Sequence, residues 1–366
     1  MTSLFSPLTL RDLTLPNRIF LAPMCQYMCE ARDGVPTDWH LVHLGARATG
    51  GFGLLLAEAT AVVPEGRISP EDTGLWNDTQ RDAWARIVDF CHTHGAPIGV
   101  QLAHAGRKAS TYRGHPGPRG SVPIEEGGWE TVGPSEIGFP GLAEPRELTR
   151  DELAGVVQAF ADAAVRADQA GFDVVEVHAA HGYLLCQFLS PLSNHRTDEY
   201  GGDFTGRTRL LLEVVDAVRA VWPDGKPLFV RVSTTEWAEG GWTLDDTVQL
   251  AGVLAGRGVD FIDVSSGGNV LAKVPPAPGY QVPLATAVRE AGIPSGAVGL
   301  ITEPAQAQDV LDHGFADAVL LGRVALREPS WPQRAAAELG DPTMARYPDA
   351  YLRGQWPDVA AQPERG

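Results

Sequence analysis

The chain has 366 residues, 44% of them hydrophobic, which is enough for a packed globular core. Its 46 acidic residues outnumber its 29 lysines and arginines, and the formal net charge of -17 argues against nucleic acid or an anionic lipid surface as a partner. The four cysteines form no C-x-x-C pair and are too few for a disulfide scaffold or an iron–sulfur cluster.

The amino-terminal segment Met1–Arg18 has no basic stretch followed by an apolar core, so we expect no secretory signal. No apolar run approaches the ~20 residues that a membrane helix needs. Together with the free thiols, these features predict a cytoplasmic protein without a membrane partner. A small phosphate group could still bind in a local pocket of backbone N–H groups and one arginine.

Eight short apolar segments alternate with helical patterns and are predicted to be strands. They are Ile19–Ala22, Leu54–Ala57, Ile98–Leu102, Val174–Val177, Leu228–Val232, Phe261–Val264, Ser295–Val298 and Ala318–Leu321. A weak repeat precedes three of them, beginning at Gly171, Gly258 and Gly314. Each glycine is typical of a helix C-terminus, and each continuous apolar run is typical of a parallel strand covered on both faces.

The helical patterns carry start signals. Thr149 with Glu152 predicts a capping box, and Thr243 and Thr302 are predicted to cap two further helices. Eight strands alternating with helices predict an α/β protein with a (β/α)8 TIM barrel as a single domain over residues 1–366. The alternative, an open doubly wound sheet, lacks a G-x-G-x-x-G motif after its first strand.

One segment interrupts this alternation. Glycine and proline supply 14 of the 33 residues of segment 113–145, too many for a helix interior. We expect a long excursion after the third strand, with a hairpin in it, which covers the mouth of the barrel as a lid. The tail 341–366 also lies outside the repeat.

In barrels of this kind, catalytic residues follow the carboxyl ends of the strands. His178 and His181 lie three residues apart at one such end, so both rings can point at one oxygen if the loop turns helical. Tyr183 lies where a phenol could deliver a proton. The alternatives are a satisfied buried histidine or a zinc site, but no third ligand stands out at a strand end.

Other strand ends carry groups suited to an anion. Arg231 lies inside an apolar run, where a guanidinium is costly unless it meets an anion. A structural ion pair with a barrel carboxylate is the alternative. Gly299, Gly322 and Arg323 follow the seventh and eighth strands, where barrels commonly hold a phosphate group.

These residues belong to stretches that resemble the old yellow enzyme family of flavin-dependent ene-reductases, in its thermophilic-like bacterial branch. The resemblance runs from about Leu4 to Trp356. The matching stretches are Leu15–Arg18, Ala22–Cys25, Glu58–Ala61, Pro64–Ser69, Gln101–Lys108, His178–Leu184, Gln187–Pro191 and Asn194–Gly202.

The resemblance implies non-covalent FMN as the cofactor and NADPH or NADH as the reductant. The residues it assigns to FMN are Ala22, Pro23, Met24, Cys25, Ala59, Gln101, Lys108, Arg231, Gly299, Gly322 and Arg323. Arg231 would stabilise the reduced ring, and the Cys25 thiol would tune its potential close to the reactive nitrogen.

The implied reaction is a ping-pong reduction of the activated C=C bond of an α,β-unsaturated carbonyl compound, and of nitro or imide compounds. His178 and His181 would hold the carbonyl oxygen, Tyr183 would protonate the α-carbon, and Tyr27 would border the substrate. Arg353, in the tail 341–366, would enter the active site of a neighbouring copy in a dimer or a dimer of dimers, which puts this tail at a subunit interface. Its alternative is a solvated tail charge.

Two further interpretations stay open. One keeps the flavin but makes the reaction a dehydrogenation or demethylation; the other is a flavin-free, phosphate-binding lyase or isomerase, although no lysine stands at a strand end for a Schiff base. The chain also departs from the family after Gly201-Gly202, where Thr205-Gly206-Arg207 replaces the usual Asn-Arg pair. This departure puts a structural cap in doubt.

Overall fold

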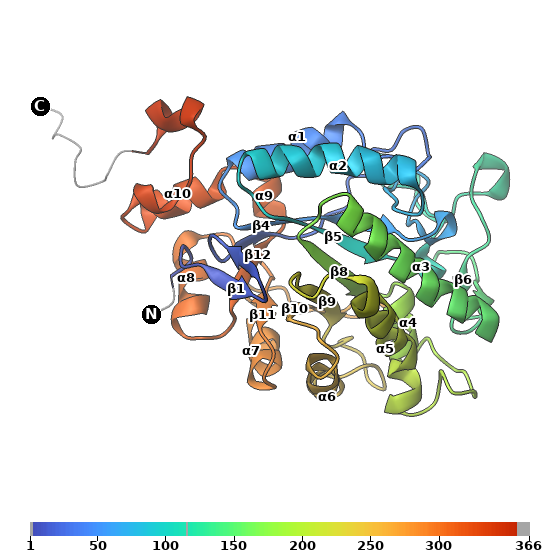
Figure 1. The fold of residues 1–366 in the computed structure, drawn as a ribbon. Coiled ribbons are helices and arrows are strands. Elements are labelled where there is room, and N and C mark those ends of the chain that lie inside the picture. Colours follow the sequence, from blue (N-terminus) through green and yellow to red (C-terminus); the bar gives the residue numbers. More distant parts are fainter. Residues whose placement is uncertain (1–2, 115, 357–366) are drawn as a thin grey trace, which may run out of the picture.

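A computed structural model describes residues 3–114 and 116–356, and its centre is a closed barrel of eight parallel strands (Figure 1). The strands are β3 (Ile19–Leu21), β4 (Leu54–Ala61), β5 (Ile98–Ala103), β8 (Val174–Ala179), β9 (Leu228–Ser233), β10 (Phe261–Ser265), β11 (Ser295–Ala297) and β12 (Ala318–Leu321). They pair in sequence order, and β12 closes the barrel on β3. The prediction of a (β/α)8 barrel is confirmed, and the open doubly wound sheet is excluded.

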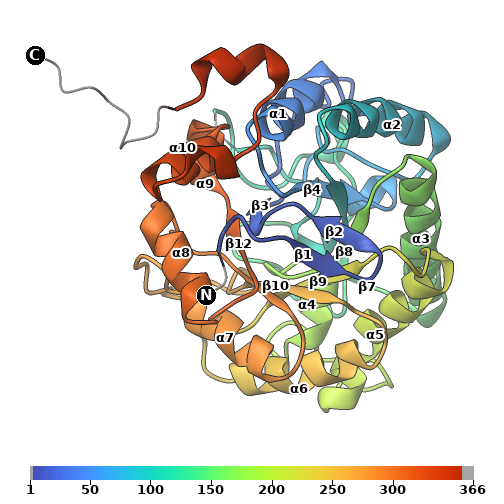
Figure 2. The ribbon, with the colours of Figure 1, turned by 60° about the vertical axis from the view of Figure 1, so that its left-hand side comes forward.

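Helices surround the barrel (Figures 1 and 2). They are α1 (Asp38–Thr49), α2 (Asp78–Thr93), α3 (Arg150–Gln169), α4 (Leu184–Leu189), α5 (Phe204–Val221), α6 (Leu244–Ala255), α7 (Val282–Glu290), α8 (Pro304–Asp312), α9 (Arg323–Arg327) and α10 (Trp331–Glu338). Five 3-10 helices complete the described part: η1 (Pro64–Gly66), η2 (Gly106–Lys108), η3 (Ile124–Glu126), η4 (Pro342–Met344) and η5 (Asp349–Gly354). None of the helices in residues 3–114 and 116–356 has the length and apolar character to span a membrane.

The barrel interior is apolar at the amino-terminal ends of the strands. Phe20, Phe229 and Phe261 pack there with other fully buried side chains. The hairpin of β1 (Leu8–Leu10) and β2 (Leu13–Leu15) adds Leu10 and Leu15 to the same cluster and covers this end of the barrel (Figure 2). Polar side chains that point inward can therefore reach an opening only at the opposite end.

The predicted helix signals are largely confirmed. Thr149 and Glu152 form the capping box of α3, and Thr243 caps α6 in the same way. Gly171 follows α3 with a φ of 90°, in the left-handed region that glycine favours after a helix. Gly258 and Gly314 have φ values of 79° and 67° after the helices that they follow.

The predicted cap at Thr302 is wrong. The N-cap of α8 is Glu303, and no side chain caps it. Pro304 takes the first helical position, where its missing N–H needs no partner, so the helix begins one residue later than the threonine requires. The Thr302 backbone N–H instead donates to Gln306 Oε1 at 3.1 Å.

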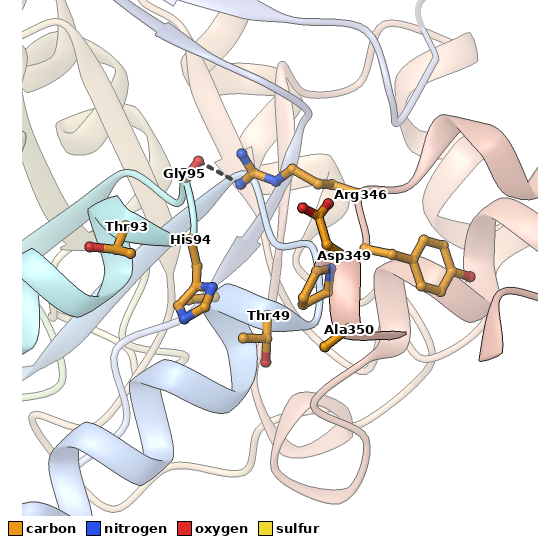
Figure 3. Close-up of a pocket in the computed structure, with 10 residues that line it drawn as sticks. Thr49, Thr93, His94, Gly95, Arg346, Asp349 and Ala350 are labelled. Atoms are coloured by element: carbon orange, nitrogen blue, oxygen red, sulfur yellow. Dashed lines mark hydrogen bonds between the residues drawn. The ribbon is translucent and has the colours of Figure 1, made fainter. Parts of the chain in front are cut away.

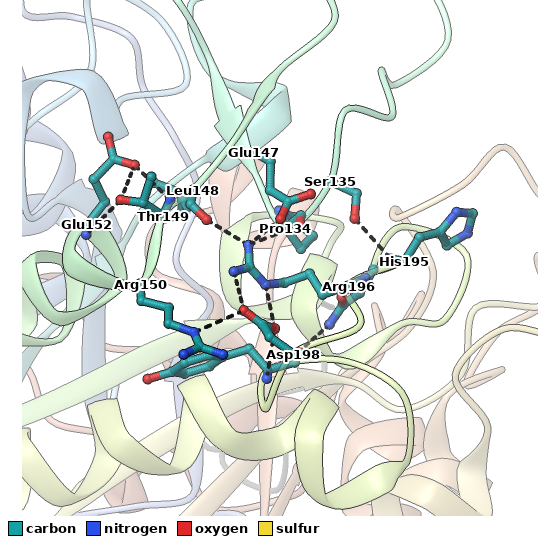
Figure 4. A network of polar contacts seen from close by, with 12 residues as sticks. Pro134, Ser135, Glu147, Leu148, Thr149, Arg150, Glu152, His195, Arg196 and Asp198 are labelled. Atoms are coloured by element: carbon teal, nitrogen blue, oxygen red, sulfur yellow. Dashed lines mark hydrogen bonds and ion pairs between the residues drawn. The ribbon is translucent and has the colours of Figure 1, made fainter.

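The long excursion leaves after β5, the third barrel strand, as predicted. Its two short strands, β6 (Val132–Gly133) and β7 (Arg146–Glu147), pair in parallel, so the expected hairpin is wrong for this pair. The Arg196 guanidinium, in the loop after α4, donates to Leu148 O at 2.6 Å and pairs with Asp198 (Figure 4). A buried arginine of the loop after α4 thus holds the end of the excursion.

The doubtful cap before α5 is present. Asp203 is the N-cap residue, and its carboxylate accepts from the Gly206 backbone N–H at 3.0 Å. Arg207 donates to Leu189 O at 2.8 Å and to Gly202 O. Asp203 and Arg207 therefore fix this turn without the Asn-Arg pair.

The two threonines give a matched test of the caps. Thr149→Ala should lower the free energy of unfolding by about 1 kcal/mol, because the N3 N–H of α3 loses its acceptor and the Glu152 carboxylate loses the hydroxyl as one of its donors. Thr302→Ala is the control, since the Thr302 hydroxyl makes no hydrogen bond within the described residues. Urea unfolding midpoints measure both. Equal shifts for the two variants would contradict the assignment of the cap.

Candidate active site at the carboxyl end of the barrel

The rim, meaning the carboxyl-terminal halves of the eight strands and the residues that follow them, gathers all but one of the predicted site residues. They are Ala22, Pro23, Met24, Cys25, Tyr27, Ala59, Gln101, Lys108, His178, His181, Tyr183, Arg231, Gly299, Gly322 and Arg323. Arg353 is the exception.

His178 ends β8, and its ring lies 5.2 Å from the ring of His181, with 77° between the planes. The prediction required this loop to turn helical, but it does not. His181 instead adopts a left-handed conformation, with a φ of 60°, and its backbone N–H donates to Ser233 Oγ at 2.8 Å. A Cβ at Gly182 would lie 2.4 Å from Gly268 O, so this turn also needs a glycine. The left-handed turn brings the two imidazoles into a T-shaped, edge-to-face arrangement.

Both imidazoles are neutral near pH 7. Burial lowers the pKa of His178 and of His181 well below the ordinary value, and the charge of Arg231 lowers both further. His181 Nε2 lies 2.7 Å from Ser265 Oγ, whereas buried His178 Nδ1 has no hydrogen-bond partner in the described part of the chain. A buried ring nitrogen without a partner is costly unless a ligand supplies one.

Three further side chains meet beside the histidines. The Tyr183 ring lies 5.1 Å from the His178 ring, and Cys25, Tyr27 and Tyr183 pack against one apolar cluster that includes Ala59. Burial raises the pKa of the Tyr183 phenol and of the Cys25 thiol well above their ordinary values. Both groups therefore keep their protons at neutral pH.

Lys108 and Arg107 connect the loops around this cluster. Lys108 Nζ donates to His181 O at 2.7 Å and to Gly268 O at 3.0 Å. Burial lowers the pKa of its ammonium to about 8. Arg107 donates to Asn269 O and to Ile137 O in the excursion. Two consecutive cations thus join the loops after β8 and β10 and the excursion.

A β-bulge in β4 supports the segment after β3. The register with β5 shifts between Ala57 and Ala59, which leaves Glu58 as the extra residue. Glu58 Oε2 accepts from the Gln26 backbone N–H at 2.7 Å, and Oε1 lies 3.1 Å from His40 Nε2 of α1. The sequence analysis assigned no role to Glu58, although it is a charged residue inside the apolar run of β4.

A second buried carboxyl, Asp72, lies near Cys25 and Tyr27 and was also missed. It accepts from the Ile68 backbone N–H at 2.8 Å and from Ser69 Oγ at 2.9 Å, and its exposed fraction is 1%. Burial first, and then the charge of Glu58, raises its pKa to about 7. Its charge in turn raises the pKa values of Cys25 and Tyr27.

Below the histidines, the barrel interior holds a polar layer. Arg231 Nε lies 2.8 Å from Asp263 Oδ2, an ion pair by distance although the angle is not that of a hydrogen bond. Gln101 Nε2 donates to Glu176 Oε1 at 2.7 Å. The ion pair left open as the alternative for Arg231 is present, and the guanidinium also lines the rim cavity, so the pair does not preclude a ligand there.

This rim cavity has a volume of about 240 Å³ and lies at the ends of β10, β11 and β12. Arg231, Gln281, Gly299, Gly322 and Arg323 are among the residues that line it. Gly299 has a φ of 118°, and a Cβ there would lie 3.1 Å from both Gln281 Nε2 and Tyr280 Cε1. A phosphate group could approach the backbone at Gly299, where no side chain intervenes, and meet the exposed Arg323.

Arg353 lies away from the rim of its own chain. It belongs to η5, and the segment before η5 lines a cavity of about 540 Å³ with Thr49 and His94 (Figure 3). Those residues end α1 and follow α2, and both helices end where the next strand begins. The carboxyl-terminal segment is therefore at the amino-terminal end of the barrel. Residues 357–366 of the predicted interface tail lie outside the described residues.

Within residues 3–114 and 116–356, no group of three His, Cys, Asp or Glu side chains is placed to hold a metal ion. The zinc alternative for His178 and His181 therefore has no third ligand here.

Comparison with known proteins assigns the whole barrel to one protein family. Residues 3–341 match the model of the NADH:flavin oxidoreductase / NADH oxidase family. The NADPH dehydrogenase of Geobacillus thermodenitrificans is 50% identical over 355 residues, which cover 96% of this chain and 98% of that protein. The NADPH dehydrogenase of Listeria innocua is 48% identical over 355 residues, 96% of this chain and 99% of that protein.

Solved structures with a similar fold support the same family assignment. Morphinone reductase in complex with tetrahydroNAD has a TM-score of 0.78 at 29% identity, covering 99% of this chain and 100% of that one. The old yellow enzyme homologue from Zymomonas mobilis has a TM-score of 0.78 at 28% identity, covering 97% and 99%. A 2-naphthoyl-CoA reductase complex has a TM-score of 0.85 at 25% identity, but 93% of this chain matches only 52% of that longer chain.

Asp72 makes a prediction about stability and pH. Its pKa is raised in the folded chain to about 7, above the ~3.9 of an unfolded aspartate. The folded state therefore holds the proton more tightly, and the stability gained is present below about pH 4 and is lost as the pH rises through about 7. Urea midpoints of the wild type should fall over this range relative to those of Asp72→Asn.

Asp151→Asn is the matched control, because it removes an exposed carboxylate. If the pH profiles of Asp72→Asn and the wild type were parallel, the raised pKa of Asp72 would be wrong.

Proposed function

The chain belongs to the NADH:flavin oxidoreductase / NADH oxidase family, to which the old yellow enzymes belong, and from this premise we propose that it is an ene-reductase for α,β-unsaturated carbonyl compounds. That it is an FMN-dependent NAD(P)H oxidoreductase follows from the family. The flavin-free lyase or isomerase is thereby excluded. The observation that carries the finer proposal is the pair of neutral imidazoles, buried at His178 and half-buried at His181, beside the protonated Tyr183 phenol.

The rim fits FMN in two respects. The cavity bordered by Gly299, Gly322 and Arg323 suits the phosphate, and the Arg231 guanidinium borders the same cavity as a counter-charge for an anion. Ala22–Cys25, Ala59, Gln101 and Lys108 would hold the remainder. When bound, FMN accepts a hydride from NAD(P)H and passes it to the second substrate.

The chain's own residues supply the polarisation. Neutral His178 and His181 offer ring N–H donors without a competing positive charge, and Lys108 fixes the backbone of the His181 turn. Two such donors on one carbonyl oxygen withdraw electrons from the conjugated β-carbon and stabilise the charge that develops on the oxygen during reduction. His181 Nε2 would exchange its contact with Ser265 for the substrate.

Tyr183 would complete the reaction with a proton. The phenol keeps its proton at neutral pH because burial raises its pKa, and an enolate carbon is basic enough to take it. Solvent would then restore the proton. Cys25 and Tyr27 would border the substrate as neutral groups. Both substrates would use this one site in turn, which makes the kinetics ping-pong.

The half-reactions test the proposal. The purified protein should be yellow, bleach anaerobically with NADPH, and regain its colour with cyclohexenone. Tyr183→Phe should slow the return of colour by a factor on the order of 10² to 10⁴, the usual contribution of a general acid, and leave bleaching nearly unchanged.

Equal loss of both half-reactions in Tyr183→Phe would remove the proton-donor role. Bleaching by NADPH without any return of colour from cyclohexenone would instead favour a dehydrogenase or demethylase on the same barrel.

We also propose that Arg353 acts on the site of a neighbouring copy, in a dimer or a dimer of dimers. In its own chain it lies at the opposite end of the barrel from the histidines. The adjacent Tyr351 and Leu352 are 60% and 52% exposed, which is unusual for large apolar side chains outside an interface.

Arg353→Ala should raise the KM for cyclohexenone severalfold and leave reduction by NADPH unchanged, because the residue would contact the second substrate without taking part in the first half-reaction. Sedimentation should show two or more copies for the wild type. A monomer with full activity would rule out this role.

A further inference from the structure

Four side chains form the polar layer inside the barrel, one step below the histidines. They come in adjacent pairs by strand register: Gln101 with Glu176, and Arg231 with Asp263. Glu176 and Asp263 are 0% exposed, and Gln101 is 2% exposed. Phe229 and Phe261 precede Arg231 and Asp263 on the same inward faces of β9 and β10, so apolar side chains pack beneath the layer.

The charges in this layer do not balance. One guanidinium faces two carboxyls, and Arg231 lies against Asp263 at 2.8 Å. Glu176 has no cation within 4.0 Å in the described part of the chain, and its Oε2 has no hydrogen-bond partner there. A fully buried carboxylate without a cation is far more costly than a neutral carboxyl with one unpaired oxygen.

We propose that Glu176 is a positioning residue for FMN, which carries a proton at neutral pH and holds the Gln101 amide in one orientation. The inference rests on the proposed place of Gln101 in the FMN site. It adds a residue that would act on the cofactor only through its neighbour.

The surroundings of Glu176 support the protonated form. Burial first, and then the charge of Asp263 on β10, raises the pKa of the Glu176 carboxyl to about 8, against the opposing effect of Arg231 on β9 and of the Gln101 hydrogen bond from β5. His178, the next inward residue along β8, is neutral and adds no charge. With Glu176 neutral, the layer has one positive and one negative group.

The contact with Gln101 explains why a carboxyl is useful there. Gln101 Nε2 donates to Glu176 Oε1, so the Gln101 carbonyl oxygen is left to accept from another partner. An amide has two orientations of nearly equal shape, and only its hydrogen-bond partners choose between them. Through this contact Glu176 favours the orientation in which Gln101 would present its carbonyl oxygen, together with its second Nε2–H, to FMN.

Infrared difference spectra test the proton directly. The carbonyl stretch of a protonated carboxyl is distinct from the carboxylate bands, and at pH 7 the FMN-loaded wild type should show one such band that is missing in Glu176→Gln. The exposed Glu290→Gln variant should keep it. The band should fade as the pH rises past about 8. Identical spectra for wild type and Glu176→Gln at pH 7 would overturn the proposal.

FMN affinity, measured by quenching of flavin fluorescence, tests the positioning role. Glu176→Gln keeps an acceptor for Gln101 and should bind FMN within about twofold of the wild type, whereas Glu176→Ala should bind on the order of tenfold more weakly. Because Glu176 would act through Gln101, Glu176→Ala combined with Gln101→Ala should lose no more affinity than Gln101→Ala alone. Additive losses would overturn the positioning role.

The two proposals fail in different ways. If Gln101→Ala leaves the FMN affinity unchanged, the assignment of Gln101 to the cofactor site is wrong, and the positioning role fails with it. If Gln101→Ala weakens FMN while Glu176→Ala does not, the FMN site holds and only the role of Glu176 is lost.

Discussion

The polar chemistry of this protein depends on a barrel that is sealed at one end. The apolar layer of Phe20, Phe229 and Phe261, covered by the β1–β2 hairpin, lets inward-pointing polar groups reach a ligand only at the rim. Desolvation by the surrounding protein then sets the protonation states: neutral imidazoles, a protonated phenol and a protonated thiol. These are the forms that can donate hydrogen bonds or a proton to a bound ligand. Site chemistry and barrel packing are consequences of the same desolvation.

The loops that carry these groups are fixed by cations rather than by a rigid element. Arg107 and Lys108, adjacent on η2, bind carbonyl oxygens of the excursion and of the loops after β8 and β10. The left-handed turn at His181 costs backbone energy of order 1–3 kcal/mol, which these contacts and the Ser233 hydrogen bond offset. The excursion, which Arg107 holds at Ile137, is thereby coupled to the position of the histidines.

Much of the site was predictable because strand ends mark it. Every predicted strand is found, and all the predicted site residues except Arg353 lie on the rim.

The polar layer was missed although the sequence carries a signal for it. The argument that a charge inside an apolar run needs a partner singled out Arg231, and it applies equally to Glu176 and Asp263 in Val174–Val177 and Phe261–Val264. Applied to all three runs, it would have predicted the polar layer. Glu58 carries the same signal inside the run Leu54–Ala61, whereas Asp72 gave none, since a loop carboxyl resembles ordinary sequence.

The sequence by itself determined the eight strands, most of their helix caps and the list of groups at the rim, because hydrophobic periodicity and capping chemistry act over a few neighbouring residues. Tertiary structure alone decided which of those groups meet and in what charge state. Arg231 pairs with Asp263 across 32 positions of sequence, and Gln101 with Glu176 across 75, by strand register that no local pattern records. Protonation follows from that register, since a carboxyl loses or keeps its charge according to which neighbours share its buried layer.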